Sequence, residues 1–242
     1  MDDSLLLVRS NLSTAYIIIL AVFRYAVKRM ATKKNKRPAR EPKYHHGDLR
    51  RAITEAALEL IEEAGIQNLS LREIARKIGV TTAAPYHHFK DRKALLIEMA
   101  IEGYTQLLQT LEGARDSVKR AGKEIEAETR AYLAFARQHA ALYAVMFSGE
   151  LANHNCLELK TIADASFALV CATVGKMGKF GEKETAEAAL CVWSMLHGLI
   201  VLDESGLLGE ERSEQERIAV EGARGILRGF AKGRDMNGKA LH

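Results

Sequence analysis

Apolar residues recur at intervals of three and four along most of this 242-residue chain, which is the spacing of one face of an α-helix. Stretches rich in Gly, Asn and charged residues separate these apolar stripes. No stretch competes with them by showing the strict apolar and polar alternation that predicts a β-strand. The pattern therefore predicts an all-α chain, with helices at about 48–64, 70–78, 82–89, 91–111, 123–139, 140–148, 155–178, 183–205 and 213–233.

Two of these helices are short and follow each other across a tight turn between residues 70 and 89. Ser70 and Glu73 form an S-x-x-E capping box that begins the first helix, and Gly79 suits the left-handed position that ends it. Thr82 is expected to cap the second, because Pro85 then lies at the third helical position, where its missing N–H removes no bond. After the longer helix 48–64, this arrangement is typical of a helix-turn-helix that binds DNA.

The same region resembles the TetR family of bacterial regulators over about residues 44–100. Three motifs carry the resemblance in order, Leu71–Ala75, Gly79–Thr81 and Tyr86–Leu95, and together they are far more specific than a helix-turn-helix spacing alone. Further along, Trp193–Gly198 is similar to the Trp-x-x-x-His-Gly (WHG) signature of one branch of that family. The resemblance implies an all-helical homodimer with an N-terminal helix-turn-helix domain and a larger C-terminal domain for dimerisation and ligand sensing.

We accordingly expect three segments. These are an N-terminal extension and basic arm (1–43), a helix-turn-helix DNA-binding domain (44–93) and a helical ligand-binding and dimerisation domain (94–242), the last beginning in a helix that Asp91 caps. The expected function is that of a cytoplasmic, dimeric repressor, bound to double-stranded DNA at a palindromic operator and released by a small effector. The alternative is a sequence-indifferent or architectural DNA-binding protein without an inducer.

The resemblance also places the DNA-facing positions. They are Ser70, Arg72, Thr81, Thr82, Ala83, Tyr86, His87, Lys90 and Arg92. The charged and hydroxyl side chains of this set suit phosphate oxygens, which position a protein without reading sequence. Thr82, Ala83 and His87 are the candidates for reading bases, because methyl groups pack on thymine and an imidazole or hydroxyl can hydrogen-bond a base edge.

Charge is distributed unevenly along the chain. Lys28–Arg51 holds ten basic residues and only Glu41 and Asp48 as acids, although the whole chain has a net charge of +4. The remainder is therefore net negative. A basic arm next to a helix-turn-helix is expected to contact phosphates or the minor groove, and a solvated tail is the alternative.

Residues 1–29 contain nine consecutive apolar residues at Ala15–Phe23. A membrane-spanning helix needs roughly 18 to 20, and Asp2 and Asp3 replace the positive start of a signal peptide. Three interpretations remain open: Met30 is the biological start, the segment is an extra helix packed on the body or a partner, or it is a membrane anchor.

The C-terminal region is rich in aromatic and flexible apolar side chains, and the TetR resemblance implies a ligand cavity among them. The candidates are Tyr104, Tyr132, Phe135, Tyr143, Met146, Phe147, Phe167, Trp193 and His197. Small-molecule sites between helices are mostly apolar with a few polar groups, so we expect a small apolar or aromatic effector. Each of these residues alone could equally belong to the core, His197 included.

Glycines recur on one face of the last predicted helix. Gly222, Gly225, Gly229 and Gly233 are three or four residues apart, and each costs about 1 kcal/mol relative to Ala inside a helix. Close approach of another helix would explain them, and the resemblance implies that this helix belongs to a dimer interface. A weakly stable terminal helix is the alternative.

No metal, cofactor or enzymatic activity is expected. His45 and His46 are neighbours in sequence, as are His87 and His88, and neither pair has a Cys, Asp or Glu at ligand spacing. The three cysteines are too few and too scattered for a disulfide framework. The sequence also lacks a nucleophile with a base, a paired-carboxylate cleft or a phosphate-binding Gly loop.

Overall fold

A computed structural model describes residues 49–120, 122–152, 155–177, 180–209 and 211–237, with side chains described as far as residue 232. Every regular element in these ranges is helical, as predicted. The α-helices are α2 (Leu49–Ala64), α3 (Leu71–Lys77), α4 (Arg92–Asp116), α5 (Glu124–Gln138), α6 (Ala140–Met146), α7 (Leu157–Met177), α8 (Glu182–Glu204) and α9 (Arg212–Asn237). Three short 3-10 helices join them: η1 (Ile66–Asn68), η2 (Ala84–His87) and η3 (Gly149–Leu151).

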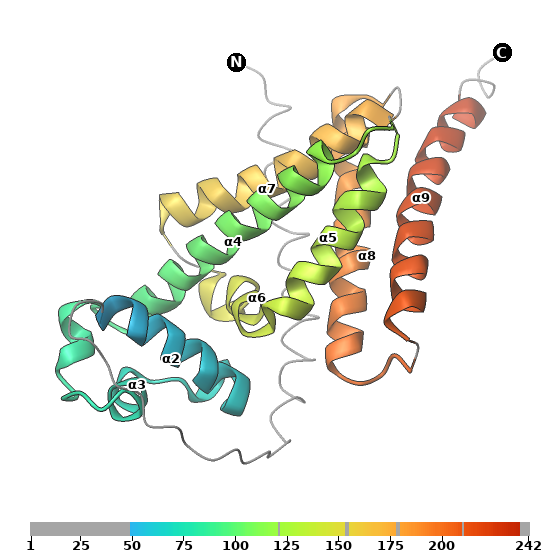
Figure 1. Ribbon diagram of the computed structural model, residues 1–242. Helices are drawn as coiled ribbons and strands as arrows, with labels where there is room; N and C mark the ends of the chain where they lie inside the picture. The colour runs from blue at the N-terminus through green and yellow to red at the C-terminus, as the bar shows by residue number, and fades with distance from the viewer. Residues whose placement is uncertain (1–48, 121, 153–154, 178–179, 210, 238–242) are drawn as a thin grey trace, which may run out of the picture. The chain divides into compact units, whose positions relative to one another are not determined.

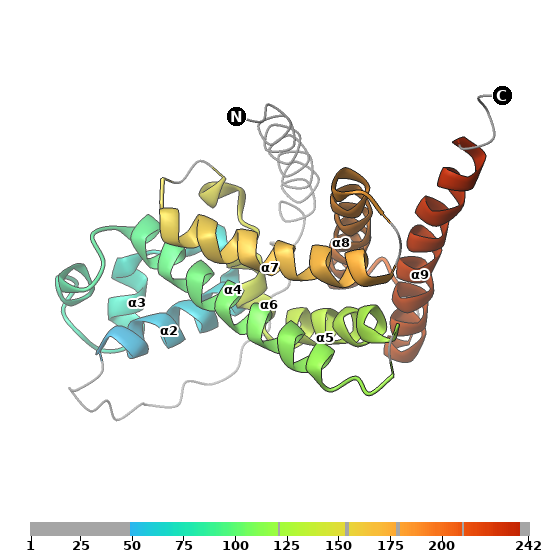
Figure 2. The ribbon, with the colours of Figure 1, turned by 90° about the horizontal axis from the view of Figure 1, so that it is seen from above.

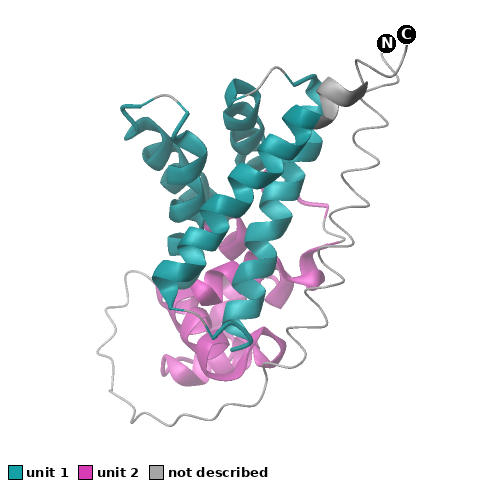
Figure 3. Cartoon of the chain, turned by 90° about the vertical axis from the view of Figure 1, so that its right-hand side faces the viewer, with its two compact units in different colours: residues 1–19, 104–138, 160–242 teal, residues 20–103, 139–159 magenta. Residues whose placement is uncertain are grey.

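The described chain divides into two compact units, which Figure 3 colours separately. The helix-turn-helix unit consists of residues 49–103 and 139–159, and the C-terminal unit of residues 104–138 and 160–237. The first unit therefore takes in the start of α4 and all of α6. The two units defined by packing therefore differ from the domains expected from the sequence, which meet at a single boundary between residues 93 and 94.

The core of the helix-turn-helix unit lies between α2, α3, the start of α4 and α6. Ile53, Ile74, Leu95 and Tyr143 contribute one fully buried side chain from each of these helices. Helix α6 lies against α2 although about 75 residues separate them in sequence, so the segment 139–159 completes this core.

Helices α5, α8 and α9 contact one another in the C-terminal unit, and Figures 1 and 2 show α9 beside the other two. Arg137 of α5 ties the three helices together. Its guanidinium lies 3.4 Å from an oxygen of Asp203 on α8 and 3.6 Å from one of Glu216 on α9, and it also hydrogen-bonds the buried Gln215. Gln215 in turn donates to Asp203 at 2.8 Å.

Helix α8 is apolar on nearly every side, and among the described residues it is the single helix long and apolar enough to cross a bilayer. Val192, Leu196 and Ile200 are buried, as in a core helix, whereas Cys191 and Leu202 are exposed. Helix α8 is thus buried on part of its surface only.

Helix α4 begins where the sequence predicts. The Asp91 carboxylate accepts from the backbone N–H of Ala94 at 2.8 Å and caps the helix. The 25-residue helix then runs from the helix-turn-helix unit into the C-terminal unit, contributing Leu95 to the first core and Leu111 to the second. One continuous element therefore belongs to both units.

Candidate functional site

The first helix of the helix-turn-helix forms as its sequence predicts. The Ser70 hydroxyl accepts from the backbone N–H of Glu73 at 3.1 Å, which satisfies one of the free amides at the start of α3. Leu71 and Ile74 are buried. Gly79 follows the helix with φ +72°, a left-handed conformation that a residue without Cβ adopts at little cost.

The second helix differs from the prediction. It is the 3-10 turn η2 rather than an α-helix, it is preceded by Ala83 rather than capped by Thr82, and Pro85 occupies its second position. The N–H of Ala84 donates to the carbonyl of Thr81 at 3.0 Å, three residues back. Pro85 has no N–H with which to make the next bond, so the first turn closes with the 3-10 pattern. The reading segment is consequently short, and its side chains come from residues 81–87.

The reading segment exposes the residues that the sequence assigns to DNA. Thr81, Thr82, Ala83 and His87 are exposed, and so is 49% of the Tyr86 side chain, an unusual fraction for a large aromatic residue. Pro85 and Phe89, by contrast, are buried. The guanidinium of Arg50 on α2 lies 4.9 Å from the centre of the Phe89 ring. The segment is thus anchored from beneath and presents polar and aromatic groups outwards.

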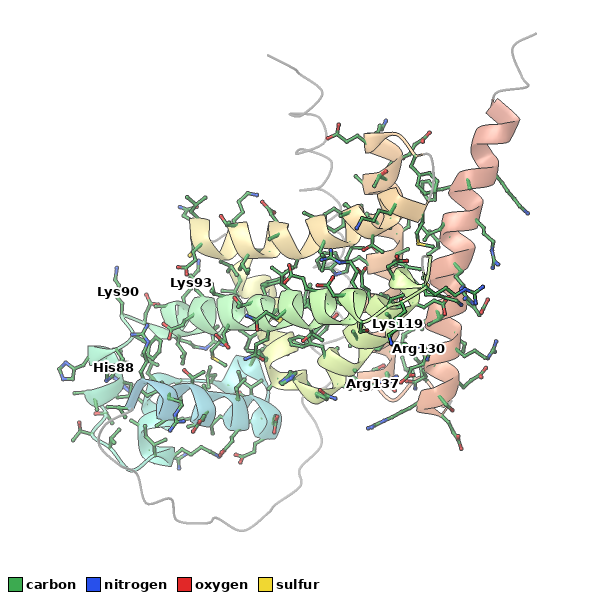
Figure 4. The ribbon with its side chains drawn as sticks, turned by 45° about the horizontal axis from the view of Figure 1, so that its top comes forward. His88, Lys90, Lys93, Lys119, Arg130 and Arg137 are labelled. Atoms are coloured by element: carbon green, nitrogen blue, oxygen red, sulfur yellow. The ribbon has the colours of Figure 1, made fainter. Side chains whose placement is uncertain are left out.

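Three unpaired cations lie next to these residues in sequence. Arg72, Lys90 and Lys93 are exposed and have no ion-pair or hydrogen-bond partner among the described residues, and Figure 4 shows Lys90 extending away from the ribbon. Lys77 differs, because its ammonium group lies 3.0 Å from Glu59 and 2.9 Å from Glu63. Within the described part of the helix-turn-helix unit, the cations left without a carboxylate therefore lie on both sides of the reading segment.

Arg92 has a different position from the one that the DNA assignment requires. Its guanidinium pairs with the Glu150 carboxylate, with one N···O distance of 3.0 Å, and also hydrogen-bonds the carbonyl oxygen of Ile66. These contacts connect α4 with η1 and η3 inside the helix-turn-helix unit. Because both terminal nitrogens of its guanidinium are engaged there, we assign Arg92 to structure rather than to phosphate contact. The basic arm falls outside the described residues.

A cavity of about 20 Å³ lies in the C-terminal unit. Its lining comes from α4, α5, α7 and α8 and consists of Leu111, Ile125, Glu128, Thr129, Tyr132, Val170, Val192, Trp193 and Leu196. Of the predicted ligand residues, Tyr132 and Trp193 line it. Their rings meet edge to face with centroids 6.2 Å apart. Phe167, a third predicted ligand residue, packs against Trp193 with ring centroids 5.2 Å apart.

The remaining predicted ligand residues have other positions. Tyr143, Met146 and Phe147 are buried in the helix-turn-helix unit on and after α6, where the Tyr143 and Phe147 rings pack 4.7 Å apart. Tyr104, Phe135 and His197 are buried in the C-terminal unit but do not line the cavity. Burial lowers the pKa of His197 to about 4, so this imidazole is neutral near pH 7.

Sequence reasoning missed Glu128 and Thr129, the polar residues of the cavity. Both are buried, and burial raises the pKa of Glu128 to about 7. A signal was present in the sequence. Ile125, Glu128, Thr129 and Tyr132 stand at i, i+3, i+4 and i+7, so two polar residues occupy an apolar helical stripe.

The glycines of α9 have two different environments. A Cβ on Gly222 would lie 2.5 Å from the sulfur of Met195, so this glycine lets α9 approach α8 of its own chain. The contact explains Gly222 within the single chain, and the assignment of this residue to a dimer interface stays a prediction. Gly225 and Gly229 are exposed, and a Cβ there would meet nothing within 4 Å.

The side chains of the described ranges include no group of three or more His, Cys, Asp or Glu residues placed to hold a metal ion. Cys156, Cys171 and Cys191 all lie among the described residues, and no disulfide joins them. Burial raises the pKa of the Cys171 thiol to about 11, which leaves it protonated and unreactive near neutral pH.

Comparisons with known proteins match both units. Residues 53–99 match the family of bacterial regulatory proteins called tetR, and residues 125–231 match the tetracyclin repressor-like C-terminal domain. The HTH-type transcriptional regulator YobS of Bacillus subtilis is 25% identical over 197 residues, which is 81% of this chain and 97% of YobS. The class D tetracycline repressor of Escherichia coli is 42% identical over 53 residues, 22% of this chain and 24% of the repressor.

A solved structure from Rhodococcus sp. RHA1, of a protein described as having unknown function, is similar to the whole described fold. It is 32% identical, with a TM-score of 0.66, and the match covers 79% of this chain and all of that one.

Proposed function

Since this chain belongs to the TetR family of transcriptional regulators, we propose that it is a cytoplasmic homodimer that represses transcription from a palindromic operator and leaves it when a small apolar or aromatic effector binds. The observation that carries the proposal is the exposed reading segment 81–87, with cations on either side of it that have no partner among the described residues. Regulators of this family bind DNA and are not enzymes. The dimer, the operator symmetry and the class of effector are the parts proposed.

Exposure and charge support dividing the DNA-facing residues into those that contact phosphates and those that read bases. Arg72 and Lys90 suit phosphate oxygens because no carboxylate among the described residues pairs with them. Ser70 and Tyr86 supply hydroxyl groups that can also bind phosphate oxygens. The base-reading candidates remain Thr82, Ala83 and His87, with Thr81 beside them. Two such segments, one from each protomer, would bind half-sites about 34 to 36 Å apart or a multiple of it.

Selection from a random duplex library, followed by footprinting, tests this proposal. We expect a palindromic site whose affinity falls with salt by ~0.9 log units per log unit of salt for each phosphate neutralised. His87→Ala should relax preference at one or two base pairs by roughly 1–3 kcal/mol. Lys90→Ala should weaken specific and scrambled duplexes equally and flatten the salt slope by about one phosphate.

Lys119→Ala is the matched control for the loss of a cation. Lys119 is also exposed and without a partner among the described residues, but it follows α4 in the C-terminal unit (Figure 4), so its loss should leave the salt slope unchanged. Recovery of no preferred sequence, with strong salt-dependent binding to all duplexes, would favour the architectural alternative. Equal losses on specific and scrambled DNA in His87→Ala would remove His87 from the base-reading set.

Helices α8 and α9 are the proposed dimer interface. Leu202 of α8 and Ile218 of α9 stay 40% and 38% exposed in the single chain, and the open face at Gly225 and Gly229 would allow a partner helix to approach closely. Apolar side chains left exposed on long helices are a usual mark of a surface covered by another protein.

The double variant Gly225→Leu and Gly229→Leu should dissociate the dimer, because two leucines would occupy the space needed by the partner backbone. Ala231→Leu is the control, since Ala231 is exposed about 140° away around α9, at 100° per residue. Sedimentation velocity distinguishes the two. A dimer that persists in the double variant would locate the interface elsewhere.

The effector site is proposed at the cavity of the C-terminal unit. Leu111 of α4 lines this cavity, and the same helix starts at Asp91 beside the reading segment. A ligand shifts the equilibrium between DNA-binding and released forms only by its differential affinity for them. Effector binding and operator binding should therefore weaken each other by the same factor. The WHG branch is a further proposal, supported by Trp193 in the cavity wall and the buried His197 one turn later.

A further inference from the structure

Two residues that line the cavity of the C-terminal unit carry buried oxygen atoms without a hydrogen-bond partner among the described residues. They are Oε2 of Glu128 and Oγ1 of Thr129, on side chains that are 3% and 1% exposed. A buried polar atom left unpaired destabilises the fold, so natural proteins retain few of them. The other lining residues are apolar or aromatic, and the two oxygens are therefore its main polar groups.

The chemistry of Glu128 limits what can satisfy it. Its Oε1 already accepts a hydrogen bond from the Thr173 hydroxyl at 2.6 Å, which leaves Oε2 as the free atom. An ionised carboxylate can only accept hydrogen bonds, so the missing group must be a donor. The charges that act on this carboxylate are Arg115 on α4, Glu124 on α5 and Lys176 on α7, and no ion pair joins either cation to it.

The aromatic residues of the cavity favour a cationic donor. Tyr132 follows Glu128 by one helical turn, and Trp193 meets Tyr132 edge to face across the lining. Ring faces attract ammonium groups, most strongly where the site is desolvated. A carboxylate oxygen beside two aromatic rings thus offers one ammonium group both a counter-ion and a π surface.

We propose that the effector of this protein is an amine, a primary or secondary ammonium group on an apolar body, whose N–H donates to Glu128 Oε2 with the Thr129 hydroxyl as a second acceptor. The inference rests on the proposed effector function and names its ligand class. A neutral hydrocarbon would leave both oxygens unpaired, and a carboxylate would add a second negative charge to the site.

The volume of the cavity sets a condition on binding. About 20 Å³ holds one water molecule, so the apolar body of the amine must displace lining side chains to enter. This is the rearrangement that an effector needs in order to favour one form of the protein over another. A single water bridging Glu128 and Thr129 is the competing explanation, and it requires no ligand.

Three probes of nearly equal shape separate these explanations with the full-length dimer. They are 4-phenylbutylamine, pentylbenzene, in which a methyl group replaces the amine, and 5-phenylpentanoate. Calorimetry at pH 8 should show the amine binding at least tenfold more tightly than pentylbenzene and the carboxylate binding most weakly. Glu128→Gln should bring the amine to the level of pentylbenzene, whereas Glu112→Gln, at an exposed position of α4, should change nothing.

The pH profile identifies Glu128 more specifically. Burial raises the pKa of this carboxyl group to about 7, and the amine stays protonated throughout the range used. Only the ionised carboxylate attracts it, so affinity should fall by up to tenfold per unit as the pH drops below 7. In Glu128→Gln the profile should be flat.

The outcomes separate this inference from the proposed function. If pentylbenzene or phenylpentanoate binds as tightly as the amine and releases operator DNA, the effector function stands and the amine inference is wrong. If the amine binds through Glu128 but DNA affinity is unchanged, the ligand class stands and induction is wrong. If no probe binds and Glu128→Gln leaves the operator complex as it was, the bridging-water explanation holds.

Discussion

Glu128→Gln is expected to remove a pH-dependent loss of stability of roughly 2–3 kcal/mol between pH 5 and pH 8. Burial in the C-terminal unit raises the pKa of this carboxyl group from 4.5 in the unfolded chain to about 7. Between these two values the folded protein binds more protons than the unfolded chain. Its free energy of unfolding therefore falls as the pH rises from about 4.5 through 7, and it levels off above that.

The measurement is the free energy of unfolding in urea at several pH values for the wild type and the variant. The difference in unfolding free energy between the wild type and the variant should change by roughly 2–3 kcal/mol from pH 5 to pH 8, whatever constant offset the glutamine introduces. His197 also makes stability depend on pH in this interval, because burial lowers its pKa to about 4 in the folded protein whereas it titrates near 6.5 in the unfolded chain. This residue is present in both proteins, so its contribution cancels. Glu112→Gln should follow the wild type, and parallel curves for Glu128→Gln would mean that the carboxylate is solvated in the folded protein.

Gly103→Leu should destabilise the protein by about 3 kcal/mol, whereas Gly113→Leu on the same helix should stabilise it by about 1 kcal/mol. A Cβ on Gly103 would lie 2.6 Å from the sulfur of Met146 and 3.1 Å from Cγ of Leu142, both on α6. Gly113 is exposed, and a Cβ there would meet nothing within 4 Å. The first change overpacks a buried contact, and the second only removes the conformational freedom of glycine.

Thermal and urea unfolding of the two variants measures this pair. The opposite signs matter more than either magnitude, because helix propensity alone predicts that both variants gain stability. Equal stabilisation by the two leucines would show that α6 does not pack closely against Gly103.

The features that the sequence predicts well are those decided within a few residues. The cap at Ser70, the left-handed Gly79 and the start of α4 at Asp91 each depend on one side chain or one missing Cβ, and all three are confirmed. The all-α fold follows in the same way from the three-and-four spacing of apolar residues. A local pattern needs no knowledge of which helices meet.

The features that escaped prediction depend on partners far along the chain. Arg92 meets Glu150 58 residues later, and Glu128 is paired with Thr173 45 residues later. The positions of the aromatic residues after α5 escaped prediction for the same reason. The spacing places Tyr143 on an apolar face of a helix, but it does not indicate that this face closes the core of the helix-turn-helix unit. The prediction of an α-helix at η2 was wrong for a local reason. Pro85 has no N–H to donate, and this missing hydrogen bond ends the α-helical pattern instead of being accommodated in the first turn of an α-helix.

The discontinuity of the helix-turn-helix unit bears on how such a protein can be recombined. A chimera that joins residues 1–103 of this chain to the effector domain of a relative would separate Arg92 from Glu150 and Gly103 from Met146 and Leu142. Exchanging DNA specificity between regulators therefore requires transplanting 139–159 together with the N-terminal part, or matching α6 to its new neighbours. The protein has two functional modules, but the segments that form them alternate along the chain. A change in the core of one module must therefore stay compatible with segments that lie on both sides of the other.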